Sequence, residues 1–158
     1  MSSRVALCLS GKIGNTKGKS GYYESDPKIL TLGSEHYKKH IIDKNEVDIF
    51  IHCWDTNLKD EIIREYSPKR YIIEEQIEFN IPSYVRGEKT RCQNHYSRWY
   101  SNKIVNQLRY EYEIENKFKY DFVMTSRFDL CLTKKIDMNM WNLNIKQFKG
   151  KQQGLIVS

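Results

Sequence analysis

Four short stretches of the chain are rich in apolar and β-branched residues and are bounded by polar or turn-forming residues. The first, RVALCLS, is almost unbroken in its apolar character, which is typical of a strand buried on both faces of a sheet. The other three are VDIFIHCW, KRYIIEEQ and YDFVMTSRFDLCL. We therefore expect strands at residues 4–10, 47–54, 69–76 and 120–132.

Three segments between these strands repeat apolar residues at helical spacing. Residues 34–45 predict a short helix with Ser34 as its N-cap. Residues 57–66 predict a second helix, which Pro68 prevents from continuing. The longest predicted helix covers residues 94–117, and the preceding residues, which include a proline and a glycine, are expected to form a loop.

The longest predicted helix carries small residues within its apolar stripe. Ser97 and Ser101 fall on the same face as its aliphatic residues, where small side chains let a helix approach a sheet closely. The alternative is that one of the two hydroxyl groups faces a ligand cleft. Tyr96, Trp99 and Tyr100 are expected to be part of the core, with one face at that cleft.

Strands that alternate with helices predict an α/β domain with a largely parallel sheet and helices on both faces. The length of 158 residues fits one such domain over residues 1–158. In sheets of this type, ligands bind beyond the carboxyl ends of the strands. Function is therefore expected at 10–11, 52–55, 74–76 and 127–129.

The segment GNTKGKSG, at residues 14–21, resembles a phosphate-binding loop because it contains Gly-Lys-Ser after a strand. Such a loop requires four residues between its first glycine and the Gly-Lys-Ser, so that its amides wrap the phosphates. Counting back from Gly18, the first glycine would have to stand at position 13, which is Ile13. Gly11 and Gly14 lie at the wrong spacing. The expected helix is also missing after Ser20, so we interpret this segment as a basic surface loop.

Charge favours anionic partners without choosing among them. The formal net charge is +6, and the candidates include nucleotides, nucleic acids and acidic glycans. Aromatic residues make up 13% of the chain, so an ordered core is expected rather than disorder. The sequence shows neither a membrane-spanning apolar stretch nor a signal peptide, which leads us to expect a cytoplasmic protein.

The four cysteines are widely separated, at positions 8, 53, 92 and 131. Three of them lie in or beside predicted strands, where a reduced cysteine behaves as a small apolar residue, so free thiols are expected. A zinc site from Cys92 and His95 with His52 and Cys53 is disfavoured. Adjacent residues of a strand point to opposite faces of the sheet.

The end of the second predicted strand carries several residues able to contact a ligand. Trp54 can stack on a base or a sugar, although a tryptophan after such an apolar run is more often part of the core. Asp55, followed by Thr56 and Asn57, is interpreted as the cap of the next helix rather than as a catalytic group.

The order and spacing of five segments resemble a family of GT-A-type glycosyltransferase-like proteins found in bacteria, viruses and phages. The segments are VALCLSG, DIFIHCW, YSPKRYIIEEQ, YSRWYSNKIVNQLRYEYE and YDFVMTSRFDLCL, and the resemblance covers most of residues 4–132. It implies a Rossmann-like three-layer sandwich with a mostly parallel sheet, which binds a nucleotide-sugar donor. An acceptor-binding half usually follows in this family, whereas only about 26 residues follow Leu132. The sequence therefore leaves three alternatives: a truncated enzyme, a minimal enzyme, and a donor-binding half without turnover.

The resemblance also implies positions for the donor. Leu9, Ser10 and Gly11 would lie near its base and ribose. His52 and Trp54 are further candidates for donor contact, because they lie at the end of the second predicted strand. The family places a carboxylate motif at SRFDL, where Asp129 would bind Mn²⁺ or Mg²⁺ on the donor diphosphate.

The carboxylate motif departs from the usual Asp-x-Asp pattern because Arg127 stands at its first position. In the usual motif two carboxylates face the same side of a strand and hold a divalent cation. Arg127 can instead bind the diphosphate through two hydrogen bonds in place of a cation. Alternatively, Arg127 and Asp129 simply pair with each other.

The resemblance implies a glycosyltransferase that moves a sugar from a nucleotide-sugar to an unknown acceptor, which can be a glycan, a protein or a lipid. Two alternatives remain: a nucleotide-binding domain without catalysis, and a basic nucleic-acid-binding module. The net charge and the many tyrosines favour the last, but the basic residues are dispersed among acidic ones.

Overall fold

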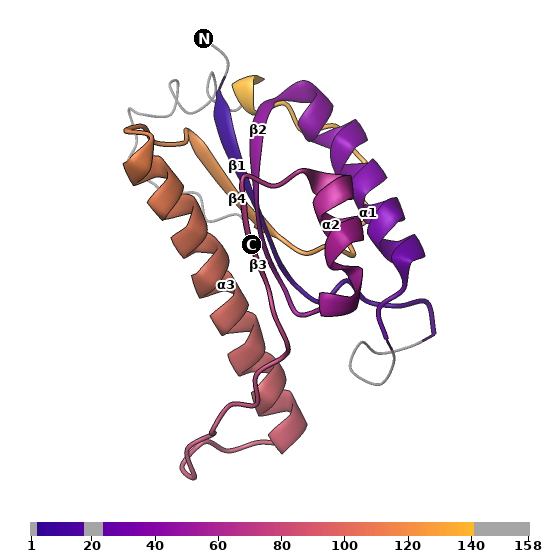
Figure 1. The fold of residues 1–158 in the computed structure, drawn as a ribbon, viewed down its shortest axis with the longest axis vertical. Helices are drawn as coiled ribbons and strands as arrows, with labels where there is room; N and C mark the ends of the chain where they lie inside the picture. Colours follow the sequence, from indigo (N-terminus) through magenta and orange to yellow (C-terminus); the bar gives the residue numbers. More distant parts are fainter. Residues whose placement is uncertain (1–2, 18–23, 141–158) are drawn as a thin grey trace.

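A computed structural model of the chain describes residues 3–17 and 24–140. It contains a four-stranded parallel sheet with the strand order β3-β2-β1-β4 (Figure 1). The strands are β1 (Arg4–Gly11), β2 (Glu46–Cys53), β3 (Arg70–Ile73) and β4 (Phe122–Ser126). The predicted α/β fold with a parallel sheet is therefore confirmed.

The central strand β1 is buried on both faces, as its apolar run predicts. Every residue from Val5 to Leu9 is 0% exposed. Leu7 and Leu9 belong to one core cluster, whereas Ala6 and Cys8 belong to another. This alternation places a separate core on each face of the sheet.

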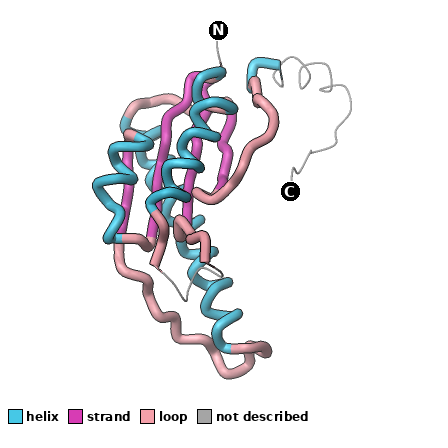
Figure 2. Tube along the Cα trace, turned by 90° about the vertical axis from the view of Figure 1, so that its right-hand side faces the viewer, coloured by secondary structure: helices cyan, strands magenta, loops and turns pink. Residues whose placement is uncertain are grey.

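Helices cover both faces of the sheet (Figures 1 and 2). The helices α1 (Pro27–His40) and α2 (Lys59–Tyr66) cover one face, and α3 (Lys89–Glu115) covers the other, over β1, β2 and β3. Two short 3₁₀ helices, η1 (Ile42–Lys44) and η2 (Thr56–Leu58), connect these elements. The result is three layers: two helices, the sheet, and one long helix.

The first helix begins seven residues before its predicted start at Ser34. Its N-cap is Asp26, whose side chain accepts a hydrogen bond from the backbone N–H of Lys28, and Pro27 occupies the first turn. Ser34 is fully buried inside the helix and donates to the backbone oxygen of Thr31 or to Glu65. The prediction was wrong because an Asp-Pro pair starts a helix as well as a serine does.

Other predicted boundaries also differ. The helix α3 begins at Lys89 rather than at residue 94, and β3 and β4 end at Ile73 and Ser126, before their predicted ends. Residues 127–136 form a connection that returns across α1, where the Ile136 N–H donates to the backbone oxygen of His40 (2.8 Å). The C-terminal stretch 141–158 lies outside the described residues.

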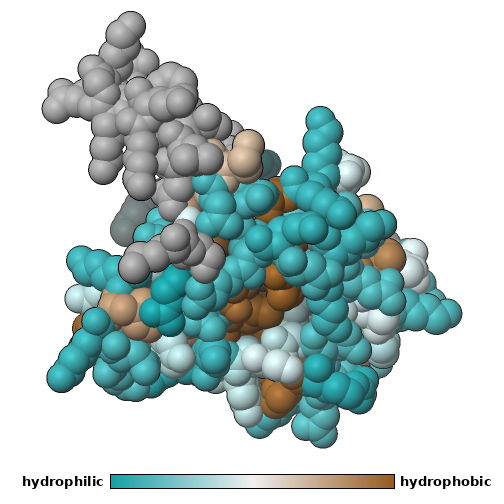
Figure 3. Space-filling model, turned by 90° about the horizontal axis from the view of Figure 1, so that it is seen from above, coloured by the Kyte–Doolittle hydropathy of each residue, from teal (hydrophilic) through white to brown (hydrophobic). Residues whose placement is uncertain are grey.

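The amino-terminal half of α3 extends beyond the carboxyl edge of the sheet, at the bottom of Figure 1. The amino edge, at the other end of the molecule, shows polar side chains around an apolar centre (Figure 3). Within residues 3–17 and 24–140, no helix has the length and apolar character needed to cross a membrane.

The connection after β4 lies tightly against α1. The side chain of Phe128 is 0% exposed, and a Cβ atom built at Gly33 of α1 would lie 2.1 Å from the backbone oxygen of Phe128. The hydroxyl of the fully buried Tyr37 donates to the backbone oxygen of Arg127 (2.6 Å). Only glycine permits this approach, which fixes where Arg127 leaves the sheet.

We predict that Gly33→Ala destabilises the protein, although alanine is the better helix former. Helix propensity alone would stabilise the variant by roughly 1 kcal/mol, whereas the clash with a backbone oxygen costs about 1–3 kcal/mol or more. Chemical denaturation measures the difference. The control is Thr31→Ala, at an exposed position of the same helix. A Gly33→Ala protein at least as stable as the wild type would contradict the close approach.

Candidate functional site

A cavity of about 540 Å³ opens at the carboxyl edge of the sheet. The ends of β1 and β4 and the residue after β2 form one side of it, and α3 forms the other. Because β2 and β4 flank β1 on opposite sides, this is the point where the strand order reverses, the usual ligand position in such sheets. We call it the edge pocket, and its lining is Ser10, Gly11, Lys12, Trp54, Gln76, Arg91, Asn94, His95, Ser97, Arg98, Ser101, Asn102, Thr125, Ser126, Arg127 and Leu130.

The edge pocket is cationic. Lys12, Arg91, Arg98 and Arg127 contribute four positive charges, and the described residues of the lining include no aspartate or glutamate. A concave surface with charges of one sign focuses the field and concentrates ions of the opposite sign. The chemistry of the lining therefore suits an anionic ligand, and arginine suits the planar, two-pronged binding of phosphate or carboxylate.

Uncharged hydrogen-bonding groups form a second part of the lining. The Gln76 Nε2 donates to Ser97 Oγ (3.1 Å), and Ser10 Oγ donates to Asn102 Oδ1 (3.0 Å). These bonds tie α3 to the ends of β1 and β3. Ser101 is 0% exposed, yet it lines the edge pocket and its hydroxyl has no hydrogen-bond partner among the described residues, so both alternatives stay open for this serine.

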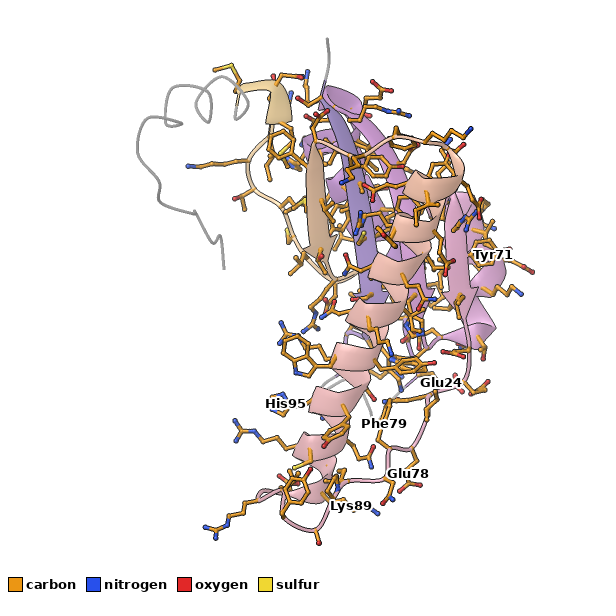
Figure 4. All side chains as sticks on the ribbon, turned by 90° about the vertical axis from the view of Figure 1, so that its left-hand side faces the viewer. Glu24, Tyr71, Glu78, Phe79, Lys89 and His95 are labelled. Atoms are coloured by element: carbon orange, nitrogen blue, oxygen red, sulfur yellow. The ribbon has the colours of Figure 1, made fainter. Side chains whose placement is uncertain are left out.

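The extended half of α3 is braced by the segment that follows β3. The side-chain amide of Gln93 bonds both the backbone N–H and the backbone oxygen of Phe79, as a neighbouring strand would. Lys89 and Glu78 form an ion pair (3.3 Å) at the same end. Figure 4 shows this segment running alongside the part of α3 that carries His95. These contacts join that half of the helix to the segment after β3.

His52 lies behind the edge pocket rather than in its lining. It is 0% exposed, and its Nε2 lies 3.0 Å from Oε1 of Glu74. Its ring makes edge contacts with Trp54 and Tyr100. Burial lowers the pKa of His52, and Glu74 opposes that shift only in part. His52 therefore supports the pocket wall as a neutral imidazole.

Trp54 is mainly a core residue. It is 5% exposed and stacks on Tyr100 with ring centroids 5.5 Å apart, so only its edge reaches the pocket. Tyr100 also contacts Phe79, but it is only partly buried and lies outside both core clusters. The prediction was wrong for Trp99, which is 72% exposed on α3.

Asp55 does not cap the following helix by its side chain as predicted. Its Oδ2 accepts a hydrogen bond from the backbone N–H of Ile13 (2.7 Å), and η2 begins without a side-chain cap. Both residues are buried, and the Trp54 N–H donates to the backbone oxygen of Gly11 (3.3 Å) alongside. Asp55 thus fastens the loop after β1 to the end of β2.

Arg127 and Asp129 form a two-pronged pair. Arg127 Nε donates to Oδ1 (2.8 Å) and Nη2 donates to Oδ2 (2.6 Å) of Asp129. Arg127 lines the edge pocket and its side chain is 60% exposed, whereas Asp129 lies outside the lining.

Of the seven residues predicted to contact a donor, four line the edge pocket: Ser10, Gly11, Trp54 and Arg127. Leu9 and His52 are fully buried, and Asp129 contacts Arg127 behind the lining. Gln76 lies in the stretch 74–76, where function was expected, but the prediction omitted Lys12 and the polar stripe of α3 at residues 91, 94, 95, 98 and 102. That stripe follows helical spacing, so the sequence contained a signal for it.

The residues at Asp129 do not fit a divalent-cation site. Both of its carboxylate oxygens are engaged by Arg127, and no second carboxylate lines the pocket. Within the described ranges, no group of three or more histidine, cysteine or acidic side chains is arranged to hold a metal ion.

The four cysteines are free, as predicted. Burial raises the pKa of the Cys8 thiol to about 12 and raises that of Cys53 as well, which is typical of inert core thiols. In the Gly-Lys-Ser segment, residues 18–23 lie outside the described part of the chain.

No protein-family model, curated protein or solved structure matched this chain. The site is therefore interpreted from its own geometry.

We predict that stability falls with decreasing pH through His52. Its pKa is lowered in the folded state, so the unfolded chain, with a pKa of about 6.5, takes up the proton first as the pH falls. Between about pH 7.5 and about pH 5.5, this linkage removes up to about 1.4 kcal/mol of stability. Urea denaturation of the wild type and of His52→Gln at both pH values measures it.

The glutamine keeps a donor toward Glu74 but does not titrate, so the variant should lose less stability over this range. His40, whose pKa burial also lowers, is unchanged in both proteins and cancels in the comparison. If the wild type and His52→Gln lost the same stability between these two pH values, a neutral, buried His52 would be contradicted.

Proposed function

We propose that the chain is a glycosyltransferase that binds a nucleoside-diphosphate sugar in the edge pocket. The observation that carries the proposal is the convergence of Lys12, Arg91, Arg98 and Arg127 beside uncharged hydrogen-bonding groups at the point where the strand order reverses. The resemblance of its five segments to GT-A-type proteins supports the same ligand class. The acceptor stays open: a glycan, a protein and a lipid are all compatible.

The lining has a cationic part and an uncharged hydrogen-bonding part, and the proposed ligand has parts that match both. A nucleoside-diphosphate sugar has a doubly charged diphosphate between two polar parts, the nucleoside and the sugar. The arginines and Lys12 suit the diphosphate, while Gln76, Asn94 and Asn102 can bond hydroxyl and base-edge groups. As the glycosidic bond breaks, negative charge grows on the departing diphosphate, and fixed cations stabilise it.

Transfer also requires a group that can accept the proton of the attacking hydroxyl. Among the lining residues that the structure describes, none carries a carboxylate and His95 is the one imidazole. His95 lies on the exposed side of α3, on the turn between Arg91 and Arg98. We assign it as the proton acceptor of this proposal.

A nucleotide-binding domain without catalysis is the second candidate. The carboxylate-free lining favours it, because such a surface can hold a diphosphate without supplying the acidic groups that many transferases use. The two candidates differ in turnover. Release of free nucleoside diphosphate with an acceptor present, lost in His95→Ala while binding is retained, would favour the transferase.

The direct test is a thermal-shift panel of UDP-, GDP-, CMP- and dTDP-sugars, each with and without Mn²⁺. A ligand that binds only the folded state raises the melting temperature. A single-stranded oligonucleotide, titrated at several salt concentrations, serves as the competing polyanion. The proposal would be rejected if the oligonucleotide raised the melting temperature and none of the nucleotide-sugars did.

We predict that Arg98→Ala weakens binding of the responding nucleotide-sugar by roughly 10-fold or more, the usual effect of losing a charge-assisted hydrogen bond. Isothermal titration calorimetry measures the change. Arg64→Ala is the matched control, since Arg64 is an exposed arginine of α2 on the opposite face of the sheet. Equal weakening in both variants would show that only net charge matters.

A further inference from the structure

The guanidinium of Arg127 has two hydrogen-bonding edges, and Asp129 occupies one of them. A guanidinium carries five N–H donors in a planar fork. The bonds from Nε and Nη2 to Asp129 use two of these donors, at 2.8 and 2.6 Å. The edge made by Nη1 and the second hydrogen of Nη2 points away from that carboxylate. Arg127 lines the edge pocket with its side chain 60% exposed, so this second edge is accessible.

The position of the pair is set by the buried residues around it. Phe128, between the two, is 0% exposed, and its backbone oxygen lies against Gly33. The Tyr37 hydroxyl holds the backbone oxygen of Arg127 at 2.6 Å. On the other side the loop after β1 passes close by, since a Cβ atom at Gly14 would lie 3.6 Å from Asp129 Oδ2. A guanidinium held in this way loses little side-chain entropy when it binds an anion.

From this geometry we propose that the free edge of Arg127 is a metal-independent binding site for two oxygens of a diphosphate, and that Asp129 is its positioning residue. The inference rests on the proposed function, because it names how the diphosphate of that ligand is held. It assigns Asp129 a role different from that of a metal ligand. The pair and the ligand then share one guanidinium, with a carboxylate on one edge and phosphate oxygens on the other.

The direction in which anion affinity changes when Asp129 is replaced distinguishes a positioning role from two other roles. If Asp129 acted only through its charge, its removal would make the pocket more positive and would strengthen anion binding. If it were a metal ligand, its removal would weaken binding only when a divalent cation is present. A positioning residue predicts weaker binding in the absence of any metal, because the released Arg127 side chain must be ordered again by the ligand.

The experiment is calorimetric titration of the full chain with inorganic pyrophosphate and with the responding nucleotide-sugar, in EDTA and in Mn²⁺. We expect Asp129→Ala to weaken pyrophosphate binding by roughly 5- to 50-fold in EDTA, and Asp129→Asn by less, since its amide oxygen still accepts one bond. Arg127→Lys should weaken binding as much as Arg127→Ala, because an ammonium presents no fork.

Asp60→Ala removes an exposed carboxylate from α2, on the other side of the sheet, and controls for net charge. Circular dichroism and the melting temperature report whether each variant folds. If Asp129→Ala does not fold, the binding measurement is made on the near-isosteric Asp129→Asn. Unchanged or tighter pyrophosphate binding by folded Asp129 variants in EDTA would overturn the inference. The inference would also be overturned if the Asp129 variants bound pyrophosphate more weakly only in Mn²⁺, or if the wild type did not bind pyrophosphate.

The outcomes separate this inference from the proposed function. If pyrophosphate binds with the expected dependence on Asp129 but no nucleotide-sugar binds, the nucleotide-sugar proposal fails while the Arg127 site stands. If nucleotide-sugars bind through Arg91 and Arg98 and are insensitive to Asp129, the proposed function stands and this inference fails.

Discussion

The structure depends on the burial of β1 at the centre of a parallel sheet. Its residues pair in register with β2 and with β4, so Leu9 lies opposite both Ile51 and Ser126. This pairing brings the carboxyl ends of the three strands together at one edge. Each face of the sheet has its own core, so helices must cover both faces. The carboxyl edge of the sheet lies between these helical layers and remains open to a ligand.

The edge pocket is held in place by polar contacts that lie outside its cationic surface. Asp55 fastens the loop after β1, the Gln93 amide braces the extended half of α3, and Tyr37 fixes the start of the connection after β4. Each contact joins segments distant in the sequence through a backbone group. Satisfying buried backbone groups in this way is strongly favoured, so the arginines project from anchored backbone.

The charge pattern gives the pocket its chemical character. Acidic side chains near it have partners: Asp129 binds Arg127, Glu74 binds His52, and Asp55 binds a backbone amide. The lining cations therefore face the opening without a competing carboxylate in the lining. This arrangement fits an anion held by side chains.

The sequence by itself determined the α/β class, the central buried strand and the strand ends at which the pocket lies, because these follow from local periodicity. It also gave Ser10, Gly11, Trp54 and Arg127 as residues of that edge. Only the tertiary structure decided that Asp55 bonds Ile13 and that the polar stripe of α3 faces the ends of β1 and β4. These outcomes depend on how distant segments approach one another, which no local pattern encodes: a glycine at position 33 has meaning only once Phe128 lies against it.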